Sequence, residues 1–576
     1  MTQERLKNRW SSIASSVRRI NLAHVLFTGM SAIAFVFILW QGRTLTFLRD
    51  DWVLIGQTQW LSVDSWMAPG NQHWAVFFYA VFRPLYAVVG MHSYLPYLAV
   101  LLAIHVIAAG GLYRLLYRVS GPLLALAAAA LILFLGTAHE DLYWAVQISY
   151  LGSVAAGIWA LVALYEGLGK RSTWICVALL IVAEGTSGIG LFFVAAAAGL
   201  VLSDGSLRRR WAAIGVPVAV YAAWYLIWGR SGGAPITPDA ISGLPAFAVE
   251  GMGNAIRSMV GVVRPIGEVA ASVLVVGVAW RVLRDEPVPP LAVAGVTGLV
   301  AQWVIIGVAR DADGPDLALA PRYIYPAAFL ILVALAALLG KAATLRQQGV
   351  RALVLAPLVV VGMFTNVSAL VDAVPQYQSD ADMTRATLMD LDLYGNTPAV
   401  MNSSHTILPI DILKEQIREH GSPVRDDIRP SVVTPISPAT ADRALVALTM
   451  DSFTLTASSS SQWSLSQPEL LGTYNASTSP VGSCLEANPL YPDSQLWVKA
   501  PSGSAFLVTA DYGGDLGVYL SHDADAQEAN AIHLGVVGGN SYAVRVPDLG
   551  PGFVWQLRFK LPAGSRDVSV CAASSH

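Results

Sequence analysis

Long apolar runs separated by short polar turns fill the chain as far as Asp372. They cover residues 22–40, 94–113, 121–138, 149–166, 173–183, 189–202, 211–229, 267–283, 290–309, 322–340 and 352–372. A helix needs about 20 apolar residues to cross a bilayer. The pattern therefore predicts a polytopic membrane protein with about eleven transmembrane helices. The runs 173–183 and 189–202 are short, so they could instead form one broken helix.

The positions of lysine and arginine predict how these helices are oriented. Basic residues favour the cytoplasmic side of short loops. If the basic N-terminus lies inside and 173–202 crosses twice, the later basic turns also lie inside: Arg114 and Arg118, Lys170 and Arg171, Arg208–Arg210, Arg281 and Arg284, and Lys341, Arg346 and Arg351. The apolar segment 74–90 contains Arg83 and Pro84, and is expected to be interfacial or re-entrant. This places the chain in the plasma membrane, with its C-terminus extracytoplasmic and the loops 41–93, 139–148, 230–266 and 310–321 outside.

The hydropathy pattern changes beyond residue 372, which divides the chain into three parts. Residues 1–372 form the transmembrane domain. Residues 373–457 read as an extracytoplasmic mixed α/β segment, with a strand at 398–403 and a helix over 410–420 that ends at Gly421. After a serine run, the part 458–576 contains seven short alternating stretches between residues 494 and 573, a pattern typical of a β-sandwich.

Composition agrees with a membrane protein and argues against a nucleic-acid partner. Only 13% of the residues are charged, against 55% that are hydrophobic. The net charge is -3 and no basic block is present. Of the three cysteines, Cys176 lies in an apolar run, whereas Cys484 and Cys571 fall in the domain expected outside and could form a disulfide there.

Two adjacent acids, Asp50 and Asp51, lie shortly after the first apolar run, in the loop expected outside. Carboxylates beside a membrane are costly unless they are solvated, paired or used. Either acid could act as a general base, with a divalent cation such as Mg²⁺ or Mn²⁺ bridging to a phosphate-bearing donor. The alternative is that one of them caps an interfacial helix.

Further polar residues fall on the same predicted outer face. These are His73, the loop residues His139, Glu140, Asp141 and Gln147, and Glu184 in the AEGTSG stretch. An acid among them could hold a metal or an acceptor hydroxyl. The alternatives are a polar cap between antiparallel helices and a water-exposed turn.

Arginines at the ends of late apolar runs are candidates for phosphate binding, because guanidinium makes bidentate contacts with phosphate. Arg310 ends one run, and Arg322 with Tyr323 begins the next. Arg230 and Arg264 are weaker candidates. Anchoring at the membrane interface would explain the same residues. The sequence has no Walker A motif, no GxGxxG after a strand and no HExxH.

Four stretches resemble the GT-C glycosyltransferase superfamily, in particular the actinobacterial arabinofuranosyl- and mannosyltransferases of the cell envelope. They are FLRDDWVLIGQ, GNQHWAVFFYAVFRPLYAVVGMHSYLPY, HEDLYWAVQISYLGS and the shorter APRYIYP. The resemblance implies a polyprenyl-phosphate sugar donor and an envelope glycan, lipid or protein acceptor. Asp50 or Asp51 would be the base of an inverting transfer. Glu140 or Asp141 would support the acceptor or a metal, which Asp51 and Glu140 could share, and Arg310 and Arg322 would neutralise the donor phosphate.

The same resemblance allows the C-terminal domain to bind acceptor glycan through Trp463, Trp497 or Trp555, although a core role is expected for at least two of these. Two other functions fit the apolar pattern. One is a transporter or flippase of a polyprenyl-linked glycan, for which the GTSG stretch between two short helices is the best feature. The other is a membrane-anchored glycan-binding protein. The acids in the outer loops favour the enzyme.

Overall fold

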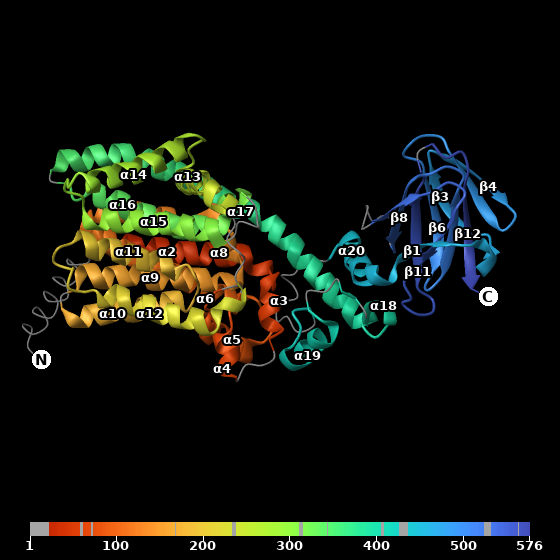
Figure 1. Cartoon of the computed structure of the whole chain (residues 1–576), viewed down its shortest axis with the longest axis horizontal. Coiled ribbons are helices and arrows are strands. Elements are labelled where there is room, and N and C mark those ends of the chain that lie inside the picture. The colour runs from red at the N-terminus through yellow and green to blue at the C-terminus, as the bar shows by residue number, and fades with distance from the viewer. Residues whose placement is uncertain are drawn as a thin grey trace, which may run out of the picture. The chain divides into compact units, whose positions relative to one another are not determined.

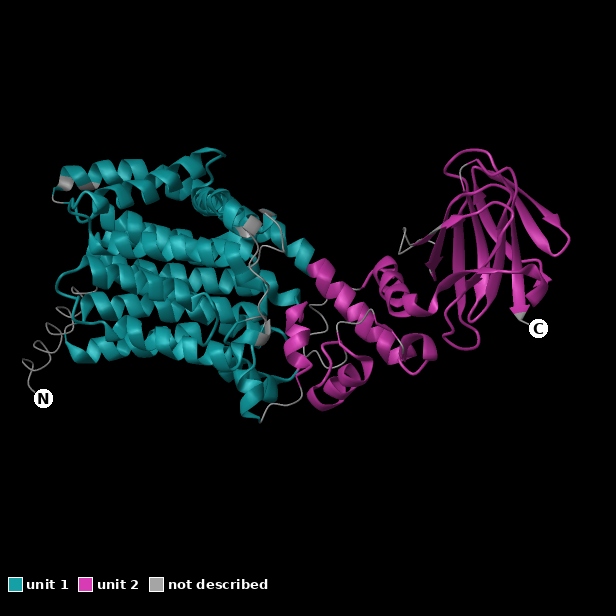
Figure 2. Cartoon of the chain, in the orientation of Figure 1, with its two compact units in different colours: residues 1–45, 58–90, 94–377 teal, residues 46–57, 91–93, 378–576 magenta. Residues whose placement is uncertain are grey.

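The computed structural model describes residues 22–57, 62–70, 73–167, 169–232, 238–309, 315–342, 344–401, 403–404, 408–424, 436–522, 531–562 and 564–575. The chain forms two compact units (Figure 2). Unit 1 comprises residues 1–45, 58–90 and 94–377, and unit 2 comprises 46–57, 91–93 and 378–576. The expected boundary at 372 lies close to the change of unit after Tyr377, but the change falls inside a continuous helix, α17 (Leu345–Tyr394).

Unit 1 is helical, with most of its long helices packed side by side (Figure 1). Its helices, besides the first part of α17, are α2 (Leu22–Gln41), α4 (Val63–Met67), α5 (Val76–Val89), α6 (Leu95–Val119), α7 (Pro122–Leu133), α8 (Glu140–Tyr143), α9 (Ile148–Glu166), α10 (Lys170–Glu184), α11 (Gly190–Ser203), α12 (Ala212–Ile227), α13 (Pro238–Val260), α14 (Ile266–Leu283), α15 (Pro290–Ala309) and α16 (Pro321–Leu339).

The protein is a multi-pass membrane protein. Seven helical segments among the described residues are long and apolar enough to cross a bilayer: Leu22–Thr44, Leu95–Val119, Ala145–Glu166, Ile266–Leu283, Pro290–Ala309, Pro321–Leu339 and Gly349–Tyr394. All eleven apolar runs form helices, but α7, α10, α11 and α12 have only 12 to 16 residues. At 1.5 Å per residue they are shorter than the roughly 30 Å hydrocarbon layer. The run 173–202 forms two helices, α10 and α11, rather than one.

The outer surface of several helices is apolar, as a lipid-facing surface requires. Ile33 and Val36 of α2 and Val273 and Val276 of α14 are all more than 60% exposed. A soluble protein rarely presents such continuous apolar patches. These side chains are therefore expected to contact lipid rather than protein.

Basic residues gather where α6 and α9 end and α10 begins. Arg114 lies 2.7 Å from the carboxylate of Glu166, the last residue of α9, and Arg118 approaches the same carboxylate at 3.5 Å. Arg210 donates a hydrogen bond to the carbonyl oxygen of Gly167 at 2.9 Å. The other end of α9 begins just after α8. With 19 residues, α9 is about 28 Å long, so the basic end and the α8 end are separated by about one hydrocarbon thickness.

The expected outer loops contain helices of their own. The 74–90 segment forms α5, in which Arg83 is almost fully buried, donates to the Ser65 carbonyl at 3.1 Å and lies 4.6 Å from the Trp66 ring centre. The 230–266 loop contains α13, whose Pro245 did not prevent a helix of 23 residues.

Unit 2 begins with helices: α3 (Asp50–Ile55), the end of α17, α18 (Pro398–Met401), α19 (Ile410–His420) and α20 (Pro438–Thr449). The predicted helix over 410–420 is confirmed as α19, and it ends at Gly421, which has a positive φ of 81°. The predicted strand at 398–403 is wrong for its first four residues, which form α18. The Thr397 carbonyl accepts the N–H of Met401 at 2.9 Å, and proline is well tolerated in a first helical turn. No strand precedes β1 in the part of 373–453 that the structure describes.

Two antiparallel sheets form the remainder of unit 2 (Figure 1). The seven-stranded sheet has the order β1-β10-β7-β12-β5-β4, with β2 also on β12, and the other sheet has the order β3-β6-β11-β8-β9. The strands are β1 (Thr454–Ser458), β2 (Trp463–Ser466), β3 (Glu469–Tyr474), β4 (Ala476–Val481), β5 (Cys484–Pro489), β6 (Gln495–Pro501), β7 (Ala505–Ala510), β8 (Gly514–Ser521), β9 (Ala531–Val536), β10 (Ser541–Arg545), β11 (Val554–Lys560) and β12 (Val568–Ser575).

The pattern of alternating residues identified β6 to β12 but not β1 to β5. In β6 and β11 every second residue is buried, and the register pairs Val498 with Leu557, so one sheet face is apolar. β1 and β4 are rich in serine and threonine, and β1, β3 and β4 are largely exposed or half-buried. These strands have no strong local sequence pattern, so pairing with neighbouring strands decides their conformation. Trp555 and Trp463 are buried, whereas Trp497 is half-buried.

A disulfide joins Cys484 on β5 to Cys571 on β12, the pairing that the sequence had left open. Such bonds persist in oxidising compartments, so it points to an extracytoplasmic C-terminal domain. Cys176 remains a free, buried thiol.

We expect the double substitution Cys484→Ser and Cys571→Ser to lower the free energy of unfolding of the β-sheet region by about 2–5 kcal/mol, because the bond closes a long loop in the unfolded chain. Thermal unfolding followed by near-ultraviolet circular dichroism measures the change. Cys176→Ala is the matched control and leaves the disulfide intact. An unchanged melting temperature with and without reductant would contradict the structural role.

Candidate functional site

An ion pair joins α8 to the start of α16 in unit 1. Arg322 Nη1 lies 3.1 Å from Glu140 Oε2, and both side chains are mostly buried. Arg322 is the second residue of α16, so its guanidinium lies at a helix N-terminus, where the partial positive charge also favours anions. Tyr323 and Tyr150 lie beside the guanidinium and interact with it. The structure thus brings together two predicted site residues that are far apart in the sequence.

Asp141, next to Glu140, lies deeper in the same cluster. Its side chain is fully buried, and neither carboxylate oxygen has a hydrogen-bond partner among the described residues. Burial raises the pKa of Asp141 well above its ordinary value, the charge of Glu140 raises it further, and Arg322 opposes both. Burial thus favours the protonated form of Asp141, whereas Glu140 is ion-paired with Arg322.

α17 supplies one wall of this cluster. His139 Nδ1 lies 2.9 Å from the Tyr377 hydroxyl, and the Tyr143 hydroxyl donates to the Leu370 carbonyl at 3.2 Å. Asn366 accepts hydrogen bonds from both the backbone N–H and the hydroxyl of Thr137, at 3.1 and 2.9 Å. These contacts hold the segment before α8 against α17. Sequence reasoning had not identified the α17 residues, because they lie in or beside an apolar run.

Gln147 was predicted to lie in the same site, and it is buried at the start of α9. Its side-chain carbonyl oxygen has no hydrogen-bond partner among the residues described. The nearby backbone is fixed by Tyr94, whose hydroxyl donates to the Tyr143 carbonyl at 3.0 Å and accepts the Ala145 N–H at 2.7 Å. Arg310 lies outside the described residues.

His73 and Glu184 lie together elsewhere in unit 1. The backbone N–H of Phe77 donates to the Gly185 carbonyl at 2.8 Å. The His73 ring lies so close to Gly188 that a β-carbon there would come within 2.8 Å of Nδ1. The segment 73–77 therefore lies alongside the turn that comes after α10, the helix that ends at Glu184.

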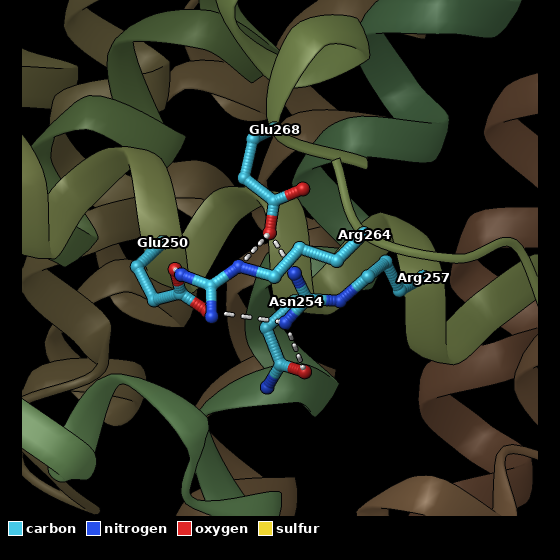
Figure 3. A network of polar contacts seen from close by, with 5 residues as sticks. All are labelled: Glu250, Asn254, Arg257, Arg264 and Glu268. Carbon is cyan, nitrogen blue, oxygen red and sulfur yellow. Dashed lines mark hydrogen bonds and ion pairs between the residues drawn. The ribbon is translucent and has the colours of Figure 1, made fainter. Parts of the chain in front are cut away.

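A four-residue charge network links α13 to α14 and was not predicted (Figure 3). Arg257 pairs with Glu250 at 3.2 Å and also with Glu268, while Arg264 contacts both glutamates. The spacing of Glu250 and Arg257 by seven residues, two helical turns, was the available signal. Arg264, a weaker candidate for phosphate binding, is thus engaged by two carboxylates.

Asp50 and Asp51 belong to unit 2, where they begin α3. Asp51 is fully buried and its Oδ2 accepts the Leu48 N–H at 3.0 Å. Through this bond, Asp51 stabilises the backbone just before α3. This role is similar to helix capping, which was one of the two interpretations of the acid pair. Asp50 is only partly buried.

Arg49, the residue before α3, has a positive φ of 45°, which is unusual for a residue with a side chain. Such backbone conformations cost about 1–3 kcal/mol and cluster at functional sites. Arg49 also lies 3.2 Å from Asp380 of α17 within unit 2, but both side chains are well exposed, so the pair contributes little.

The described residues do not form a divalent-metal site. No group of three or more histidine, cysteine, aspartate or glutamate side chains converges among them. Asp51 is engaged by a backbone N–H, Glu140 is paired with Arg322, and burial favours the protonated form of Asp141. Mg²⁺ and Ca²⁺ require charged or otherwise available oxygen ligands. We therefore assign no step to the Mg²⁺ or Mn²⁺ that the resemblance allowed.

Neither the models of known protein families nor the curated protein sequences match this chain.

We expect Asp141→Asn to flatten the pH dependence of stability. Above the ordinary carboxyl pKa of 3.8 the unfolded chain loses the Asp141 proton while the folded protein retains it, so the stability of the wild type falls as pH rises toward the raised pKa. The amide carries no such proton. Melting temperatures of both proteins between pH 5 and 9 measure this pH dependence. The melting temperature of the variant should rise relative to that of the wild type as pH rises. Parallel curves would show that Asp141 is ionised in the folded protein.

Proposed function

We propose that this protein transfers a sugar from a polyprenyl-phosphate donor to an acceptor of the cell envelope, on the outer face of the membrane. The observation that carries the proposal is the Arg322–Glu140 pair at the N-terminus of α16. An arginine at a helix N-terminus is suited to an anionic group at the membrane surface. The Glu140 carboxylate occupies a position in which a phosphate would be equally favoured.

The orientation of unit 1 supports an outer site. The basic turns around Glu166 and Arg210 belong inside by the positive-inside rule, and α8 lies at the opposite end of α9. Likewise, the basic end of α10 is opposite Glu184. The end of α16 expected at the cytoplasmic side is opposite Arg322. With these helices crossing the bilayer, and with α7, α11 and α12 completing the eleven spans expected, Arg322 would face the extracytoplasmic headgroups, where a lipid-linked donor is loaded.

The chemistry requires one base and one anion-stabilising group. An acceptor hydroxyl oxygen attacks the anomeric carbon, its proton passes to a carboxylate, and the bond to the phosphate oxygen breaks with both electrons going to the phosphate. Arg322 would neutralise that developing charge. The base stays with Asp50 or Asp51, as the resemblance implies. Asp50 is the better candidate, because Asp51 is buried and holds the Leu48 N–H.

A transporter is less well supported. Transporters place their polar groups near the bilayer midplane. In unit 1 the acids Glu140, Asp141 and Glu184 lie at helix ends, and α10 and α11 are separate helices. The antiparallel sheets of unit 2 would, as a β-sandwich, bind acceptor glycan, with the half-buried Trp497 the best stacking surface of the three tryptophans.

Substitution of Arg322 tests the donor site. We expect Arg322→Gln to lower transfer from polyprenyl-phosphate sugars to envelope acceptors by about 100-fold or more, because the leaving phosphate loses its cation. Arg322→Lys should recover part of the rate. Arg114→Gln, at the basic end of the helices, is the control and should leave the rate unchanged. Equal rates for wild type and Arg322→Gln would remove Arg322 from the reaction.

Substitution of the two acids separates base from support. Asp50→Asn should lower the transfer rate by roughly 100-fold or more with an unchanged melting temperature, since only the proton acceptor is lost. Asp51→Asn should lower the melting temperature, because the amide is a weaker acceptor for the Leu48 N–H. Full activity in both variants would rule out the acid pair as the base.

A further inference from the structure

Buried polar atoms without partners gather at the turn between α10 and α11, residues 185–189. The Glu184 side chain is fully buried, and neither of its oxygens has a hydrogen-bond partner in the described part of the chain. The same is true of the buried Ser187 hydroxyl and Trp74 indole N–H. Buried polar groups in folded proteins are nearly always hydrogen-bonded, so we expect a ligand or ordered water to complete these three groups.

Backbone contacts establish that these three groups share one place. Phe77 N–H bonds to the Gly185 carbonyl, and His73 lies against Gly188, so the segment that carries Trp74 follows the turn. The turn itself is held from α9, because the Ser153 hydroxyl donates to the carbonyl oxygens of Ala183 and Ser187.

Aromatic rings from α12 lie over the same turn. Trp74 stacks on Trp224 with 5.8 Å between ring centres and 17° between planes. Tyr221 lies 5.3 Å from Trp224 and close enough to Glu184 to interact with it electrostatically. The turn therefore combines a carboxylate acceptor, a hydroxyl, an N–H donor and flat apolar faces.

α9 also connects this turn to the proposed phosphate site. Tyr150 interacts with Arg322, and Ser153, three residues later, binds the turn. Three residues advance a helix by about 4.5 Å. The first two turns of α9 thus contact both groups of residues within unit 1.

We propose that Glu184, Ser187 and Trp74 bind the hydroxyl groups of a neutral sugar ring, as the acceptor subsite of the transfer reaction, an assignment that rests on the proposed function. A carboxylate accepts hydrogen bonds from neighbouring sugar hydroxyls, Ser187 and the indole N–H donate, and the apolar ring face packs on tryptophan. A phosphate is disfavoured because Glu184 would repel it. A metal is disfavoured because no group of three suitable ligands occurs among the described residues.

The test uses the full-length protein in lipid nanodiscs, with methyl α-arabinofuranoside and methyl α-mannopyranoside as probes. Saturation-transfer NMR reports binding, and inorganic phosphate is the negative ligand. We expect Glu184→Gln and Ser187→Ala each to weaken binding of a responding glycoside by about tenfold or more, as loss of a buried hydrogen bond requires. Trp74→Phe keeps a ring face and removes the N–H, so it should weaken binding less. Arg114→Gln, at the basic end of the helices, is the control and should bind the glycoside as the wild type does.

The outcomes separate this inference from the proposed function. Glycoside binding that depends on Glu184 in a protein without transfer activity supports the subsite and rejects the transferase. In an active enzyme, the subsite requires Glu184→Gln to raise the acceptor KM with little change in kcat. Transfer with an unchanged acceptor KM in both Glu184→Gln and Ser187→Ala, at wild-type melting temperature, overturns the subsite and leaves the transferase standing. Binding of neither glycoside also overturns it and leaves water as the partner of these groups.

Discussion

An arginine at the start of a membrane helix requires an anion beside it, and in unit 1 the carboxylate of Glu140 fulfils this requirement for Arg322. The pair links α8 to α16, while the contacts of His139 and Tyr143 with α17 hold the same segment from another side. Its neighbour Asp141 is buried beside this pair, and burial favours the protonated form of Asp141. The two acids, adjacent in the sequence, therefore lie in different environments.

The same requirement explains why polar groups collect at helix ends. A charged group in the hydrocarbon layer is costly, so the apolar helices carry their ion pairs near their termini. Glu166 with Arg114 and Arg118 marks one end of unit 1, and Glu140 with Arg322 marks the other. The α13–α14 network neutralises four further charges in the same way. The proposed donor and acceptor sites use the groups that this sorting leaves at the end opposite the basic turns.

Two buried acids, Asp141 and Glu184, show how cost and function are related. Neither has a hydrogen-bond partner among the described residues, which is expensive for the fold. A bound substrate can supply the hydrogen bonds that such groups lack in the folded protein. The stacked Trp74 and Trp224 and the Ser187 hydroxyl give the Glu184 turn the character of a sugar site, whereas the Asp141 cluster, with its arginine and helix N-terminus, has the character of an anion site.

The sequence by itself determined that the chain is a multi-pass membrane protein, where each apolar helix lies, and which strands from β6 onward alternate. These properties depend on local hydropathy, which a short window contains. It also marked most of the polar residues discussed above, since charges are rare in apolar surroundings. Only the tertiary structure decided that Glu140 pairs with Arg322, that His73 lies on the Glu184 turn, that Asp51 supports a backbone N–H, and that residues 398–401 are helical. The physical reason is that pairing, burial and capping depend on residues brought together from distant parts of the chain, and no window of the sequence contains both partners.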